Sequence, residues 1–151
     1  MPKTIISDAS CFIILSKIGE MDLLQKVYGE VITTPEVVDE FGEFLPEWVV
    51  IKSPTNADKQ KILEIEVDRG EASAISLALE IKDCTIILDD IKARRLAKKL
   101  GIEVTGTLGV IIKAKLDGII PSIKPILEKL KKTNFRLKEE LEFQALKEAG
   151  E

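Results

Sequence analysis

The sequence contains no histidine, and this absence removes several kinds of catalytic chemistry at once. Ser-His-Asp and Cys-His nucleophilic catalysis, histidine-ligated zinc sites and histidine general acid–base chemistry all require an imidazole. Any catalysis by this chain must therefore use carboxylates, hydroxyls and amines.

Aromatic residues, cysteines and long apolar runs are also scarce. Aromatics make up 5% of the chain, and the single Trp48 and Tyr28 offer no platform on which a nucleic-acid single strand could stack. The two cysteines, Cys11 and Cys84, lie inside apolar segments and are interpreted as buried free thiols rather than a disulfide. No apolar run has the length of a membrane span or the pattern of a secretory signal, so a cytoplasmic protein is expected.

The remaining composition is that of an ordinary globular protein. The chain has 151 residues, of which 45% are hydrophobic and 32% are charged, and this favours a single domain, 1–151. The net charge is −4, so no overall positive field attracts nucleic acid. Binding of that kind must depend on a local patch.

Short β-branched runs alternate with longer helical patterns along the chain. The strands are predicted at 3–7, 30–34, 48–52, 84–89 and 102–106. Helices are predicted at 9–18, 21–28, 35–45, 56–67, 70–82, 91–100, 107–117, 122–132 and 137–149. This alternation predicts an α/β protein with a parallel sheet covered on both faces. The helical extension 122–151 is expected to pack on the sheet or on a partner through an apolar stripe formed by Ile123, Ile126, Leu127, Leu130, Leu137 and Leu141.

Acidic residues follow two of the predicted strands. Asp8 ends the first strand, and Asp89 and Asp90 end the fourth. In parallel α/β sheets, ligands bind beyond the carboxyl ends of the strands. Asp8 and Asp90 could each cap the helix that follows, but two acids at matching strand ends are harder to explain by capping alone.

Two glutamates lean towards the apolar faces of predicted helices. Glu40 lies three residues after Val37 and four before Phe44, which are both predicted to belong to the apolar stripe of helix 35–45. Glu71 shares a face with Ile75. The alternatives are an ordinary helix-edge glutamate for Glu40 and compensation of the helix dipole for Glu71. Clustered carboxylates cannot all stay ionised without a cation, and oxygen ligands select Mg²⁺ or Mn²⁺. Such ions can promote phosphodiester cleavage by water.

A basic run follows the acidic pair directly. Lys92, Arg94 and Arg95 are near enough to the strand end to meet a phosphate backbone, and they are predicted to face outwards. Lys98 and Lys99 are interpreted as a solvated surface at the C-terminal end of a helix.

Two hydroxyls complete the candidate site. Thr107, in the segment VTGTLG, precedes a helix whose free N–H groups could bind a phosphate or a water on the metal. The segment lacks the lysine and the spacing of a P-loop. Ser10 could orient a metal ligand or make only a local hydrogen bond.

The order of these acids carries a family resemblance. Asp8 in IISDAS, Glu40 in PEVVDEF, Glu71 in RGEASAISLALE and Asp90 in IILDDIKARRLAKKLGI arrive in the order of the acidic set of PIN domains. The chain resembles PIN-domain proteins related to VapC-type toxins. It resembles more closely the DUF3368 subgroup, whose pattern LDD..ARR.A..LGI.V.GTLGVI..AK..G.I is present at 88–120 almost without a gap.

The resemblance implies a three-layer α/β/α sandwich with a parallel five-stranded sheet in the order 3-2-1-4-5. It also implies an endoribonuclease that depends on Mg²⁺ or Mn²⁺, the toxin of a toxin–antitoxin pair. Asp8, Glu40, Glu71 and Asp90 would then be the catalytic acids, with Asp8, Glu71, Asp89 and Asp90 holding the metal. Many relatives bind a small antitoxin and form homodimers, so RNA, an antitoxin and a second copy are the expected partners.

The chain departs from the family pattern at two points. Glu71 stands where many PIN nucleases have an aspartate, and LDD replaces the usual T-x-D. The distance from Asp90 to Gly101 aligns Asp90 with the family's acid. Asp89 is then a further ligand or an ion-pair partner of the following arginines.

Two other functions fit parts of the sequence. A non-catalytic PIN-fold module could bind nucleic acid or protein without cutting. An acid-cluster phosphatase or phosphoacceptor receiver would also place acids at strand ends. A receiver needs an acceptor aspartate after the third strand, however, and WVVIKSP offers none.

Overall fold

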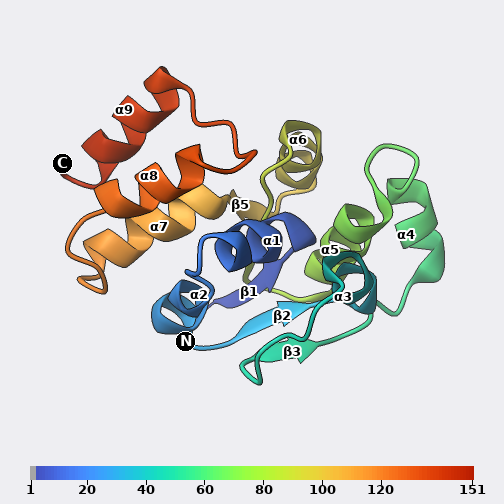
Figure 1. Ribbon diagram of the computed structural model, residues 1–151. Coiled ribbons are helices and arrows are strands. Elements are labelled where there is room, and N and C mark those ends of the chain that lie inside the picture. Colours follow the sequence, from blue (N-terminus) through green and yellow to red (C-terminus); the bar gives the residue numbers. More distant parts are fainter. Residues whose placement is uncertain (1–2) are drawn as a thin grey trace.

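The computed structural model describes residues 3–151, which build a parallel sheet of five strands in the order β3-β2-β1-β4-β5 (Figure 1). All neighbouring strands run parallel. Their bounds are β1 Thr4–Ser7, β2 Val31–Thr33, β3 Val49–Ile51, β4 Cys84–Ile87 and β5 Glu103–Thr105. The predicted strands, their order and their directions are confirmed, although each strand is shorter than predicted.

The helices also follow the predicted sequence of elements. Their bounds are α1 Ala9–Lys17, α2 Asp22–Tyr28, α3 Pro35–Phe41, α4 Ala57–Leu63, α5 Arg69–Glu80, α6 Ile91–Lys99, α7 Thr107–Leu116, α8 Lys124–Lys131 and α9 Glu139–Glu148. α3 ends four residues earlier than predicted, because Gly42 adopts a left-handed conformation with φ 74° and caps the helix. Phe44 therefore lies outside the helix and is fully exposed, so its predicted place in the apolar stripe is wrong.

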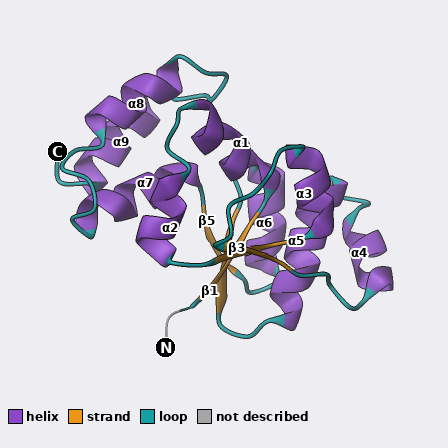
Figure 2. Cartoon of the chain, turned by 60° about the horizontal axis from the view of Figure 1, so that its bottom comes forward, coloured by secondary structure: helices purple, strands orange, loops and turns teal. Residues whose placement is uncertain are grey.

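The sheet is buried on both faces, as expected for parallel strands whose sequences are continuous apolar runs. Along β1, Ile5 packs into one apolar cluster and Ile6 into the other, and Ile87 and Ile86 alternate in the same way along β4. The first cluster includes residues of α1, α2, α7, α8 and α9. The second includes residues of α4, α5 and α6 (Figure 2). These layers confirm the predicted α/β/α sandwich.

The helices α8 and α9 contribute to the first cluster. Most of the predicted apolar stripe is confirmed, because the cluster buries Ile123, Ile126, Leu127 and Leu130, and Leu137 packs against it. Ala145 of α9 is buried there as well. Leu141 was expected in the same stripe but is exposed. Among residues 3–151, no helix combines the length and the apolar character that crossing a bilayer requires.

The two cysteines are free and buried, as predicted. Cys11 belongs to the first apolar cluster and Cys84 to the second, so they lie on opposite faces of the sheet. Neither thiol pairs with the other.

The strand register brings the ends of β1, β4 and β5 to one edge of the sheet. The N–H of Asp8 donates to the carbonyl of Ile87 at 3.2 Å, and the N–H of Leu88 donates to the carbonyl of Thr105 at 2.9 Å. The ladder therefore continues one residue beyond each strand. Asp89 comes next in the chain and leaves the sheet at the same edge as Asp8.

Candidate active site

Asp8 is the most deeply buried acid of this edge. Its side chain is 1% exposed and caps α1, with Oδ1 accepting a hydrogen bond from the N–H of Cys11 at 3.4 Å. The other oxygen, Oδ2, is buried and has no hydrogen-bond partner in the described part of the chain. Capping therefore accounts for only one of the two oxygens. A buried carboxylate oxygen without a donor is unfavourable, so Oδ2 requires a proton or a cation.

The fold places three of the other predicted acids close enough to act on Asp8. Burial raises the pKa of Asp8 well above its usual range, and the charges of Asp89, Glu71 and Glu40 raise it further, in that order. Asp90 instead acts on Glu71, whose pKa it helps to raise. Residues from four separate parts of the chain thus meet at one edge of the sheet.

Asp89 is held by the N-terminus of α7. One carboxylate oxygen accepts the N–H of Thr107 at 2.8 Å, and the other accepts the Thr107 hydroxyl at 2.5 Å. Arg94 turns back towards the sheet and donates from Nη1 to the carbonyl of Leu88 at 2.8 Å. Asp89 is therefore bound by Thr107, and the ion pair with Arg94 or Arg95, one of the two roles considered for it, does not form among residues 3–151.

Gly106 allows this close arrangement. A Cβ at that position would lie 2.7 Å from Nη1 of Arg94 and 2.9 Å from Oδ1 of Asp89, so any larger residue would displace both groups. Arg94 is half-buried, and its predicted outward orientation is wrong. Lys92 and Arg95 are exposed as expected. They are the exposed cations of the first half of α6, the half nearest the acids in sequence, whereas Lys98 and Lys99 are exposed at its C-terminal end.

Asp90 is an exposed N-cap. Its carboxylate accepts the N–H of Ala93 at 3.0 Å in the first turn of α6. The two adjacent acids therefore have different roles: the charge of Asp89 acts on the buried Asp8, and Asp90 caps its own helix. The spacing to Gly101 gave Asp90 the main role, whereas the charge that acts most strongly on Asp8 is that of Asp89.

Glu71 occupies a capping box at the start of α5. Its N–H donates to Asp68 at 2.8 Å, and the N–H of Asp68 donates to the Glu71 carboxylate at 3.3 Å. The Glu71 side chain is only 8% exposed. Burial, followed by repulsion from Asp68, raises its pKa to about 7. Asp68 was not among the predicted site residues, although D-x-x-E at 68–71 is the spacing of a capping box.

Glu40 lies at the outer rim of the site, on α3. Its side chain is exposed, and partial burial followed by repulsion from Asp68 raises its pKa. A Cβ at position 70 would lie 2.6 Å from Oε1 of Glu40, so Gly70 makes room for this carboxylate. Glu40 and Asp68 line an open depression of 490 Å³ together with Glu36 and Asp39.

A pair of buried hydroxyls connects the helices that carry the two glutamates. Thr34 caps α3, and its hydroxyl lies 2.7 Å from that of Ser73 in α5. The Ser73 hydroxyl in turn donates to the carbonyl of Gly70 at 2.7 Å. These hydrogen bonds link α3, which carries Glu40, to the first turn of α5, which carries Glu71. No local sequence pattern identifies the pair, because its members are 39 residues apart.

The acids of the site are suitable ligands for a hard divalent cation. Oδ2 of Asp8 accepts no hydrogen bond from the described residues, and Asp89 and Glu71 add two further carboxylates whose charges act on Asp8. As their side chains are placed, no three acids or cysteines among residues 3–151 are close enough together to hold an ion. A cation would have to draw Asp89 and Glu71 away from their present hydrogen bonds. Ser10 is half-buried in the first turn of α1 and makes no side-chain hydrogen bond in the same part of the chain.

Comparison with sequence models of known protein families gives a match to the PIN domain family DUF3368 over residues 4–151. The matched segment includes every acid described above. A search of curated proteins gives no significant match. The family match confirms the resemblance that the order of the acids indicated.

Proposed function

This chain belongs to the PIN domain family, and from that premise we propose that it is a metal-dependent endoribonuclease that hydrolyses phosphodiester bonds in RNA. PIN domains are commonly nucleases that use divalent metals. The observation that carries the proposal is the buried, unpartnered Oδ2 of Asp8 with the charges of Asp89, Glu71 and Glu40 around it. Such a set of acids stays ionised together only when a cation compensates it.

The residues divide the work of the proposed reaction. Asp8, Asp89 and Glu71 would hold Mg²⁺ or Mn²⁺, with Asp90 as a further carboxylate beside Glu71. The bound ion would supply a Lewis acid that activates water and neutralises charge on the leaving oxygen. Glu40 would complete the outer side of the site. This acidic edge repels RNA until a cation is bound, so metal and substrate are expected to bind in that order.

We also propose that Lys92 and Arg95 contact the RNA backbone beside the acids. Both side chains are exposed on α6, the helix that begins directly after Asp89 and Asp90. Contacts of this kind position a strand but do not read its sequence. Arg94 would instead support the strand end through Leu88.

The toxin role rests on the family resemblance alone. We propose that the ribonuclease is the toxin of a toxin–antitoxin pair, that a small antitoxin inhibits it and that two copies form a homodimer. A small helix-turn-helix-like protein encoded beside this chain would support the pairing. Growth arrest on expression, relieved by that neighbour, would test it directly.

One observation favours the alternative of a non-catalytic PIN-fold module. Asp89 and Glu71 already receive hydrogen bonds from Thr107 and Asp68, so the protein itself satisfies part of the acidic set. A module that binds RNA or a protein without cutting it would need no more than this. Metal-dependent turnover separates the two functions.

The decisive experiment compares cleavage of a labelled, structured RNA by the wild type, by Asp8→Asn and by Asp58→Asn. Asp58 is an exposed acid of α4 and serves as the matched control. We expect cleavage with Mg²⁺ or Mn²⁺, none with EDTA, and a loss of at least about 10²-fold in Asp8→Asn. Asp58→Asn should behave as the wild type. Unchanged cleavage by Asp8→Asn would refute the assigned site, and RNA binding without any cleavage would favour the alternative.

A further inference from the structure

Positive charge is concentrated in one short segment of this acidic protein. Residues 124–138, here called the basic segment, contain six lysines and arginines and a single acid, which gives a net charge of +5. The other 136 residues contain 16 basic and 25 acidic side chains, a net charge of −9. Such an asymmetry is typical of a surface that meets an anionic partner.

Within the basic segment, α8 turns its apolar side chains inwards and its charges outwards. Ile126, Leu127 and Leu130 are buried in the first apolar cluster, while Lys129 and Lys131 are exposed. The helix is therefore fixed by its packing. Its cations lie on the surface without being needed for the core.

The connection between α8 and α9, residues 132–138, also has apolar side chains that point inwards and charged side chains that point outwards. Phe135 and Leu137 pack against the first apolar cluster, whereas Arg136 and Lys138 are exposed. The Thr133 hydroxyl donates to a carbonyl of α8 at 2.7 Å and accepts the N–H of Phe135 at 3.1 Å. The connection is thus anchored to the protein, so its cations are presented on a fixed frame.

Part of the positive charge is already paired. Lys129 forms an ion pair with Glu20 at 3.1 Å, and Lys131 forms one with Glu142 at 2.7 Å. The connection carries three cations, Lys132, Arg136 and Lys138. None of them makes an ion pair within residues 3–151. Unpaired surface cations gain most from an added polyanion, because each phosphate that they neutralise releases counterions condensed on the nucleic acid.

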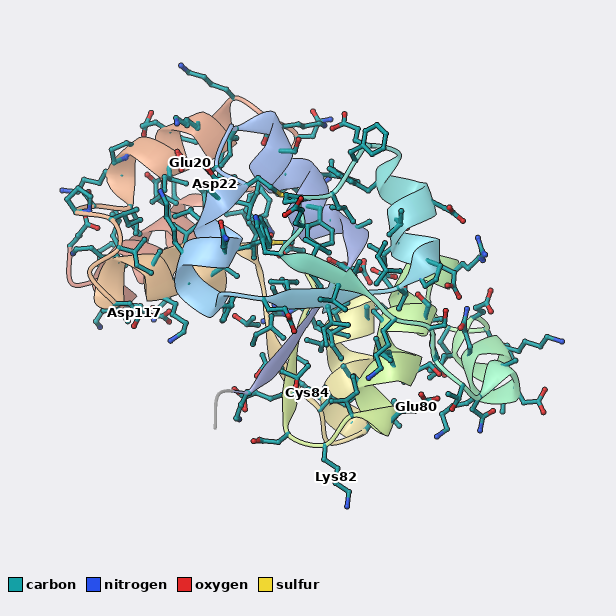
Figure 3. All side chains as sticks on the ribbon, turned by 90° about the horizontal axis from the view of Figure 1, so that it is seen from below. Glu20, Asp22, Glu80, Lys82, Cys84 and Asp117 are labelled. Atoms are coloured by element: carbon teal, nitrogen blue, oxygen red, sulfur yellow. The ribbon has the colours of Figure 1, made fainter. Side chains whose placement is uncertain are left out.

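The connection lies beside α1, the helix that begins directly after Asp8. This neighbourhood is visible in Figures 1 and 2. Figure 3 shows Glu20, just beyond the C-terminal end of α1, next to the C-terminal helices, where it pairs with Lys129. α1 has nine residues and is therefore about 13 Å long. A strand bound at Asp8 has to extend only a short way to reach the connection.

We propose that the basic segment is a second RNA-binding surface, which holds the phosphate backbone at a distance from the acidic site through Lys132, Arg136 and Lys138. The choice of RNA as the anion rests on the proposed ribonuclease function. Contacts between these cations and phosphates supply affinity without sequence specificity. The segment therefore acts on substrate binding and leaves the chemistry to the acids.

The test measures RNA affinity at several salt concentrations, with Asp8→Asn in the background so that the RNA stays intact. The variant K132Q/R136Q/K138Q is compared with K26Q/K61Q/K82Q, which removes three other exposed lysines. Lys82 lies far from the C-terminal helices (Figure 3). We expect the first triple variant to bind RNA at least about 10-fold more weakly. The slope of the logarithm of the binding constant against the logarithm of the salt concentration should become shallower by about 2 for single-stranded RNA. The control should keep affinity and slope.

The same triple variants with Asp8 intact separate binding from cleavage. We expect KM to rise and kcat to stay unchanged for K132Q/R136Q/K138Q, with no change for the control. Equal RNA affinities for the two triple variants would overturn the proposal. It would also be overturned if K132Q/R136Q/K138Q bound RNA as tightly as the wild type but bound an acidic peptide such as polyglutamate more weakly. The proposed function can fail on its own: lost RNA affinity with no cleavage by any variant would support the surface and refute the nuclease.

Discussion

The inner and outer acids of the site differ in what surrounds them, although they lie at the same edge of the sheet. Asp8 and Glu71 are buried, and both oxygens of Asp89 accept hydrogen bonds from Thr107. Glu40 and Asp90 are exposed to solvent, so their carboxylates remain hydrated. The inner acids have lost hydration and repel one another, so they have the most to gain from a cation. The outer acids add charge at little energetic cost.

Asp89 and Asp90 allow the strongest test of this difference, because they are adjacent. Asp89→Asn should lower metal-dependent RNA cleavage by at least about 10²-fold, since it removes an inner carboxylate. Asp90→Asn should lower cleavage by about 10-fold or less, since asparagine still caps α6. Rate measurements at saturating Mn²⁺ check both values. A larger loss of cleavage in Asp90→Asn than in Asp89→Asn would place Asp90 among the inner acids. It would then have the role that its spacing to Gly101 predicted.

The buried Glu71 predicts that the metal-free protein becomes less stable as the pH rises. Its pKa is about 7 in the folded protein and near the ordinary value of 4.5 when unfolded, so the folded state binds more protons between these values. The free energy of unfolding should therefore fall from about pH 4.5 to pH 7, by on the order of 3 kcal/mol from this residue. The raised pKa of Asp8 acts in the same direction.

Urea denaturation in EDTA between pH 4 and pH 8 measures this effect. Glu71→Gln should flatten the pH dependence, while Glu64→Gln, a change at an exposed glutamate, should not. Saturating Mn²⁺ should remove much of the slope in the wild type, because the cation favours the ionised carboxylates. Identical slopes for the wild type and Glu71→Gln would contradict the inner position of this residue.

Thr107 should affect stability through Asp89. Thr107→Val keeps the size of a fully buried side chain and removes the hydroxyl that donates to Asp89 at 2.5 Å. The metal-free protein should lose about 1–2 kcal/mol, because hydrogen bonds to charged groups are the stronger ones. Thermal denaturation checks this value. No change would mean that the hydroxyl contributes little to holding Asp89.

The hydroxyl pair between α3 and α5 should give the smallest effect. Ser73→Ala should lower the free energy of unfolding by about 1 kcal/mol, and Thr34→Val by somewhat more because Thr34 also caps α3. A double-mutant cycle should show a coupling of about 0.5 kcal/mol or more between them. Strictly additive effects would show that the two hydroxyls do not act as a unit.

The general architecture could be predicted because its signals are local. β-branched runs alternating with helical patterns specify the parallel strands, and acids directly after two strands specify the edge at which a site forms. Gly42 is less visible in the pattern: as the C-cap of α3 it shortens the helix and leaves Phe44 in solvent, where an uninterrupted stripe had been expected.

The details of the site depend on contacts that no local pattern records. Spacing cannot decide whether the charge of Asp89 or of Asp90 acts on Asp8, because Asp89 is held by Thr107, which lies 18 residues away. Arg94 turns inwards because Gly106 leaves it room, which again is a tertiary contact. Asp68 is a different case: its capping-box spacing was present in the sequence and could have identified it.

Calorimetric titration of Mn²⁺ into the wild type, Asp8→Asn and Glu40→Gln at pH 7 tests the central claim most directly. The wild type should bind the ion and release protons, because the pKa of Glu71 lies close to that pH. Binding should be lost in Asp8→Asn and largely retained in Glu40→Gln. Undiminished binding by Asp8→Asn would contradict a cation site built around the unpartnered oxygen of Asp8.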